Sequence, residues 1–94
     1  MTDPDKFLGS PEALEAVAAI AHERWAHWQR YVHGQCIRLD DGSLVIPAQL
    51  VNRWTRQIST AYADLTDGEK DSDREQAREY LTALTIAENE AANK

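Results

Sequence analysis

Apolar side chains recur at steps of three and four residues over the first third of the chain. They define one face of an amphipathic helix, which consists of Leu14, Val17, Ala18, Ala21, Trp25, Trp28 and Val32. Three further apolar residues lie partly off this face and offer a second flank: Ala13, Ile20 and Tyr31. Ser10 suits the N-cap, Pro11 the first helical position and Gly34 a left-handed stop. The pattern predicts a helix from Ser10 to about His33.

The spacing of the apolar residues changes between Cys36 and Ile46. Ile37 and Leu39 precede the segment Asp40-Asp41-Gly42-Ser43, and Leu44 and Ile46 follow it. A turn rich in Asp and Gly between short apolar runs predicts a β-hairpin. Because two strands alone are only marginally stable in water, we expect the hairpin to pack against the helices.

Two more helices are expected after the hairpin. Pro47 opens a helix that ends near Ser59, and a connector containing Tyr62 follows it. The apolar stripe of this helix is Leu50, Val51, Trp54 and Ile58. Thr66 and Glu69 have the spacing of a capping box at the start of the last helix. The expected core face of the last helix is Ala77, Tyr80 or Leu81, Leu84 and Ala87.

Together these elements predict a mainly α fold of three helices, with a short β-hairpin between the first and second helix. Residues 1–9 are expected to form an N-terminal arm, in which Phe7 and Leu8 tuck against the body. Residues 10–89 form a single helical domain, and residues 90–94 form a polar C-terminal tail that frays. A chain of 94 residues suits one domain with one modest core.

The charge balance narrows the possible partners. The formal net charge is −6, which disfavours nonspecific binding to nucleic acid and to anionic membranes, because both need clustered lysine and arginine. A local basic pocket for one phosphate-bearing molecule stays possible. The N-terminus has no signal-peptide pattern, and the single cysteine, Cys36, favours a reducing compartment, so we expect a cytoplasmic protein that does not enter the membrane.

The sequence offers no catalytic or metal-binding pattern. His22 and His27 are five residues apart, which turns the second ring about 140° from the first, whereas zinc-protease helices need a spacing of four. A metal site that also used His33 and Cys36 would need the chain to fold back on itself. There is no glycine-rich phosphate loop or nucleophile elbow. We therefore expect a protein that is not an enzyme and needs no cofactor.

Three tryptophans are a high number for a chain of this size. Trp25 and Trp54 are expected in the core, because large aromatic residues dominate burial in small domains. Trp28 is expected to be half exposed, where it can stack on a nucleobase beside an arginine. The charged run from Glu69 to Arg74 fits a solvated helix face with an Asp71–Arg74 pair.

Two segments resemble the ryanodine-receptor-type (RyR) domain. Ala21-His22-Glu23-Arg24-Trp25-Ala26 is similar to the family's Ala/Val-His-Glu-x-Trp-Ala helix, and residues 62–74 are similar to its Tyr-x-x-Leu-x-x-x-Glu-Lys-x-x-Asp-Arg segment. The two segments cover about 20 of the 94 residues. Arg30 lies one position further along the chain than the arginine of the family pattern. The family's Gly-Trp-x-Tyr-Gly loop is absent here, and the predicted hairpin and second helix stand in its place. This arrangement resembles the short stand-alone RyR-like proteins of tailed phages and prophages.

The resemblance implies binding rather than turnover. In such a domain Tyr62 and Leu65 would pin the connector onto Trp25, and the groove beside them would accept a nucleotide-like ligand. The expected groove residues are His22, Trp25, Trp28, Tyr62, Lys70 and Arg74. A phage protein of this kind would sequester or sense a host signalling nucleotide in the host cytoplasm.

Two other interpretations stay open. In the first, the chain is a protein-interaction or homo-oligomerisation module without a small ligand, and Phe7, Trp28 and Tyr31 form an exposed apolar patch. In the second, it is a nucleic-acid-associated phage regulator. That interpretation requires one basic face made of Arg24, Arg30, Arg53 and Arg56.

Overall fold

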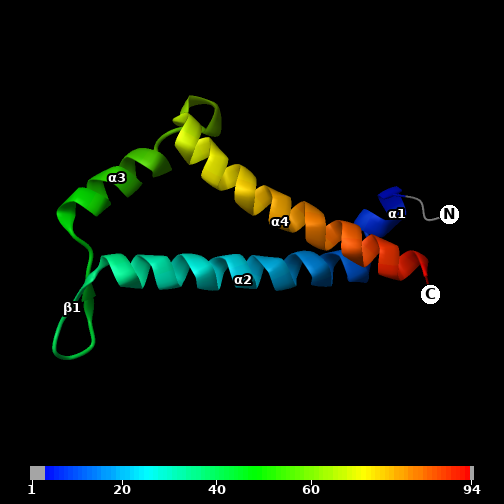
Figure 1. Cartoon of the computed structure of the whole chain (residues 1–94), viewed down its shortest axis with the longest axis horizontal. Helices are drawn as coiled ribbons and strands as arrows, with labels where there is room; N and C mark the ends of the chain where they lie inside the picture. The colour runs from blue at the N-terminus through cyan, green and yellow to red at the C-terminus, as the bar shows by residue number, and fades with distance from the viewer. Residues whose placement is uncertain (1–3, 94) are drawn as a thin grey trace.

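The computed structural model describes the backbone of residues 4–93 and is mainly helical (Figure 1). The elements in chain order are α1 (Pro4–Leu8), α2 (Pro11–Gln35), β1 (Ile37–Arg38), β2 (Leu44–Val45), α3 (Ala48–Ile58), the 3-10 turn η1 (Tyr62–Asp64) and α4 (Asp67–Ala92). The predicted mainly α class is confirmed, and so is a hairpin between the first two long helices.

Helix α2 begins where its capping residues predict. The Ser10 hydroxyl accepts a hydrogen bond from the Ala13 amide at 3.2 Å, and Pro11 occupies the first helical position. The predicted end at His33 is too early, since the helix runs on to Gln35. Gly34 keeps helical geometry and does not act as the left-handed stop.

The N-terminal arm contains a short helix that the sequence did not predict. Phe7 of α1 is only 3% exposed, which confirms that the arm tucks against the body, whereas Leu8 is 61% exposed. The Ser10 hydroxyl donates a hydrogen bond to the Phe7 carbonyl and links α1 to the start of α2. Residues 1–3 of the predicted arm lie outside the described residues.

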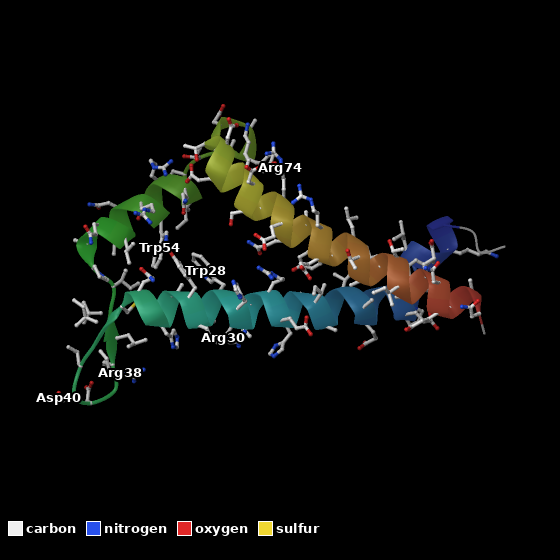
Figure 2. All side chains as sticks on the ribbon, viewed as in Figure 1. Trp28, Arg30, Arg38, Asp40, Trp54 and Arg74 are labelled. Carbon is white, nitrogen blue, oxygen red and sulfur yellow. The ribbon has the colours of Figure 1, made fainter. Side chains whose placement is uncertain are left out.

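The hairpin is formed by β1 and β2 in antiparallel register, with Ile37 opposite Val45. Gly42 has a φ of 90°, and the Asp41 carboxylate accepts a hydrogen bond from the Ser43 amide at 2.9 Å, which closes the turn. Hydrogen bonding to the Ser43 side chain, and next to its amide, lowers the pKa of Asp41. The prediction that the hairpin packs on the helices is wrong. It projects away from them (Figure 2), and Ile37 is 57% exposed.

The capping box at the start of α4 is present as predicted. The Glu69 amide donates to the Thr66 hydroxyl at 3.2 Å, and the Thr66 amide donates to the Glu69 carboxylate at 3.0 Å. The helix continues to Ala92 and so passes the predicted end at residue 89. Lys94, the last residue of the predicted tail, lies outside the described residues.

Helices α2, α3 and α4 form the three sides of a triangular frame (Figure 1). The C-terminal half of α4 lies along the N-terminal part of α2, the two helices diverge from there, and α3 bridges the open end. The molecule measures 55 × 35 × 17 Å, so the frame is flat. Its radius of gyration is 17.9 Å, against about 12 Å for a compact domain of this length.

The core of this frame is small. Four apolar residues are buried among those described: Phe7, Ala13, Ile20 and Leu50. Two of them belong to the second flank of α2, whereas Leu14 and Trp25 of the predicted core face are 67% and 59% exposed. The predicted face was wrong because α2 carries apolar residues on two flanks, and spacing alone cannot decide which of them meets α4.

Candidate functional site

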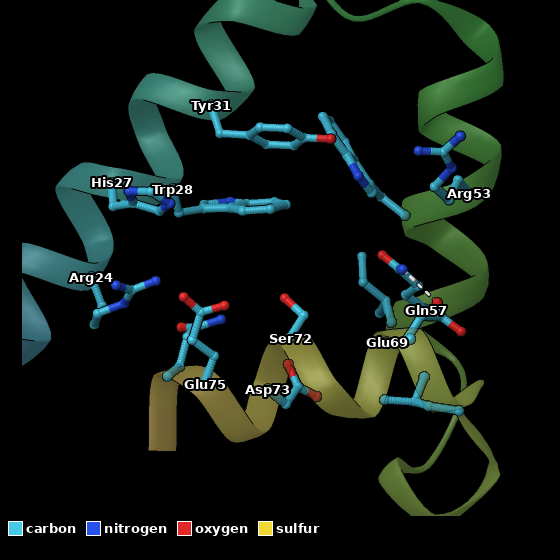
Figure 3. Close-up of a pocket in the computed structure, with 15 residues that line it drawn as sticks. Arg24, His27, Trp28, Tyr31, Arg53, Gln57, Glu69, Ser72, Asp73 and Glu75 are labelled. Carbon is cyan, nitrogen blue, oxygen red and sulfur yellow. Dashed lines mark hydrogen bonds between the residues drawn. The ribbon is translucent and has the colours of Figure 1, made fainter. Parts of the chain in front are cut away.

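The three sides of the frame enclose a hollow of about 780 Å³ (Figure 3). Its wall includes Trp28 and Tyr31 from α2, Trp54 and Ile58 from α3, and Leu65 between η1 and α4. The hollow is open to solvent. Its size is in the range of small-molecule pockets, but its openness also suits a protein segment.

Aromatic rings form the wall at the α2–α3 corner. Trp28 and Trp54 meet edge to face with their ring centroids 5.6 Å apart, and Tyr31 lies 5.4 Å from Trp28. Trp28 and Tyr31 are three residues apart on a helix and therefore share one face. Trp28 is 45% exposed, which confirms the expected half-exposed ring. The corner therefore presents a rigid apolar surface to the hollow.

The charges around the hollow are separated by helix. Arg24 and Arg53 stand on the α2 and α3 sides, and three carboxylates stand on the α4 side (Figure 3): Glu69, Asp73 and Glu75. The Nε atom of Arg24 is buried without a hydrogen-bond partner among the described residues. The carboxylates oppose the entry of a phosphate group, since like charges repel strongly in a partly desolvated site.

The α3–α4 corner is tied by one carboxylate. Glu69 accepts hydrogen bonds from Gln57 Nε2 at 2.5 Å and from Arg56 Nη2 at 2.9 Å, in addition to those from Thr66. These hydrogen bonds lower the pKa of Glu69 to about 2. The bond from Gln57 has the largest effect, and those from Thr66 and Arg56 follow. Glu69 thus joins the end of α3 to the first turn of α4.

The six residues predicted to line a ligand groove fall in three places. His22 and Trp25 stack on each other along α2, with their ring centroids 5.9 Å apart, and both are exposed outside the hollow. Trp28 lines the hollow. The interpretation of Trp25 as a core residue is wrong, because the residue is 59% exposed.

The other three predicted residues gather at the start of α4. The Lys70 ammonium lies 5.8 Å from the centre of the Tyr62 ring, and Arg74 pairs with Asp71 at 2.7 Å, as the sequence predicted for that pair. The Asp71 carboxylate is the main cause of a raised pKa of Arg74, and Tyr62 adds to it. The aromatic pairs of the described residues do not include the predicted contact between Tyr62 and Trp25.

Sequence reasoning missed most of the residues that line the hollow. Trp54 was assigned to the core, and Trp28 and Tyr31 were named together only in the alternative interpretation of an exposed apolar patch, although they stand three positions apart on α2. That spacing was the available signal for an aromatic pair. The contribution of Arg53 and Ile58 depends on the angle at which α3 crosses between the two long helices, which no local pattern encodes.

Among the side chains of residues 6–93 there is no group of three from histidine, cysteine or acidic residues placed to hold a metal ion. The helices described here include none with the length and apolar content needed to cross a bilayer. The chain matches no family model, no curated protein and no solved structure. Any function must therefore be argued from the frame and its surfaces.

Proposed function

We propose that this chain is a protein-interaction module whose open helical frame is completed by a protein partner. The main support for this proposal is the large solvent-exposed area of the chain. The chain exposes 7303 Å², whereas a compact monomer of 10.6 kDa exposes about 5,500 Å². The excess of roughly 1,800 Å² exceeds the 800 Å² or so that each partner buries in a standard interface.

The kind of surface that is exposed supports the same proposal. Stable domains pack two or more layers around a core, whereas helices α2, α3 and α4 of this flat frame surround an open hollow. Large apolar side chains are exposed around it, including Ile58 at 84%, Leu14 at 67% and Leu81 at 63%. Scattered exposed apolar residues are ordinary, but a frame with so few buried ones gains little stability from its own core.

A dye-binding experiment tests this proposal. We expect the dilute chain to bind 8-anilinonaphthalene-1-sulfonate, which reports accessible apolar surface, and we expect the signal to fall when a protein partner covers the frame. An isolated chain that is helical, cooperatively folded and free of bound dye would contradict the proposal, because its apolar faces would already be covered.

A second candidate function is binding of a nucleotide-like ligand in the hollow. It is favoured by the aromatic wall of Trp28 and Trp54 beside Arg24, whose Nε atom lacks a partner in the described structure. A base can stack on such rings while an arginine holds phosphate. The carboxylates of α4 weigh against it. Calorimetric titration with ADP-ribose, cyclic nucleotides and ATP tests it, and flat heats at millimolar ligand would discard it.

Membership of the RyR-type family and a phage origin remain predictions that rest on residues 21–26 and 62–74. Absence of catalysis is likewise part of the proposal. Neither interpretation requires a cofactor. A basic nucleic-acid face is less favoured, because Arg24 and Arg53 share the hollow with acidic residues of α4, and Arg56 pairs with Glu69.

A further inference from the structure

Positive and negative charge are divided between opposite sides of the frame. The C-terminal half of α2 (residues 24–35) and α3 together carry four arginines and no acidic residue. Helix α4 carries eight acidic residues against three basic ones. One side of the frame is therefore basic and the other acidic, although the whole chain has a net charge of −6.

Part of this charge is unmatched within the chain. The ion pairs of the described residues join Arg56 to Glu69 and Arg74 to Asp71. Arg53 on the basic side and Asp73 on the acidic side are exposed, and neither belongs to those pairs. Both are among the residues that line the hollow, Arg53 from the α3 side and Asp73 from the α4 side (Figure 3).

We propose that the partner is a second copy of this chain, turned over so that the basic side of each frame covers the acidic helix α4 of the other. This inference rests on the proposed interaction function and names its partner. A two-fold axis in the plane of the frame brings the same face of both copies together, and it repeats each basic-to-acidic contact twice. Complementary charge then sets the orientation of the two copies.

The apolar residues fit the same arrangement. The aromatic corner of Trp28 and Trp54 and the exposed Ile58 lie around the centre of the frame, and the unmatched charges flank them. An apolar centre with a charged rim is the usual composition of a protein interface. If each copy covers the roughly 1,800 Å² that it exposes beyond a compact monomer, the dimer is in the size class of obligate homodimers.

Two charge-reversal variants test the inference. Arg53→Glu places acidic charge against the acidic α4 of the other copy, and Asp73→Lys places basic charge against the basic side. Each alone should weaken self-association by about tenfold or more, because the symmetric interface contains the repulsion twice. Mixed in equal amounts, the two variants should form a heterodimer in which both contacts are complementary. Arg38→Glu, the same charge change on the projecting hairpin, is the matched control and should dimerise like the wild type.

Sedimentation velocity of the single variants, the mixture and the wild type gives a decisive set of results. Helix content that falls in each single variant and returns in the mixture also supports the inference, because the copies then fold together. If the wild type sediments as one chain and still binds the dye, the proposal that the partner is a second copy is overturned. The proposed interaction function is then not contradicted. A wild-type dimer that neither variant weakens, or a mixture that does not associate, overturns the proposed orientation.

Discussion

The indole of Trp28 meets that of Trp54 edge to face, with ring centroids 5.6 Å apart and an angle of 60° between the planes. This contact joins α2 to α3 at the wide end of the frame, where α4 has moved away from α2. Edge-to-face pairs of this kind stabilise beyond the area that they bury. The pair therefore holds α2 and α3 together at this corner of the hollow.

Replacing Trp54 by alanine should open this corner. A buried Trp→Ala change costs 3–5 kcal/mol, and because Trp54 and Trp28 stay partly exposed we expect about 2 kcal/mol. Urea denaturation followed by circular dichroism measures the loss. Trp54→Phe, which keeps an aromatic edge, should recover about half of it. Equal denaturation midpoints for Trp54→Ala and the wild type would show that the pair does not hold the corner.

The stability of the α3–α4 corner should depend on pH through Glu69. Its pKa is lowered to about 2 in the folded chain from an ordinary value of 4.5, so the folded state favours the charged form. The resulting stability is present above pH 4.5 and is lost as the pH falls from there toward 2. Glu69→Gln should unfold a few degrees lower at pH 7 and show a shallower decline over that range. Parallel melting curves of variant and wild type between pH 5 and 2 would contradict this.

The two glycines Gly42 and Gly34 should respond in opposite directions to alanine. Gly42 has a φ of 90°, which an L side chain adopts only with strain, so Gly42→Ala should destabilise the hairpin by about 1 kcal/mol. Gly34 lies inside α2 in open space, where alanine is the better helix former, so Gly34→Ala should stabilise by up to about 1 kcal/mol. Thermal denaturation compares them, and a shift of the same sign in both would refute the turn geometry.

Ile58 should contribute to association more than to folding of the single chain. It is 84% exposed, so Ile58→Ser removes little burial within one chain but removes an apolar side chain from the covered centre of the frame. We expect an affinity loss of about tenfold, corresponding to 1–2 kcal/mol of apolar transfer. Ile37→Ser on the hairpin is the matched control, with 57% exposure outside the hollow. Equal effects of both substitutions on the dissociation constant would argue against an interface at the hollow.

Local chemistry made much of the secondary structure predictable. Ser10 with Pro11 and Thr66 with Glu69 specify helix starts through hydrogen bonds within a single turn, and both starts were predicted correctly. The Asp-Gly turn of the hairpin is equally local. Helix ends were less predictable, since a glycine such as Gly34 permits a stop but does not enforce one.

The arrangement of the helices was not predictable in the same way. The choice between the flank of Ile20 and the face of Trp25 depends on which side of α2 meets α4, and both sides are apolar. The prediction from residue spacing also assumed a compact core. It therefore placed Trp25 in an interior that the open, flat frame does not have. The hollow arises from helices that diverge, and the predicted groove residues were therefore distributed over three places.

Small-angle X-ray scattering combined with light scattering on the same sample tests the open frame most directly. At low concentration we predict a radius of gyration near 17.9 Å for the single chain, and at higher concentration the mass of two chains with little increase in that radius. A particle with the mass of one chain and a radius of gyration near 12 Å would contradict the open frame and the proposal that a partner completes it.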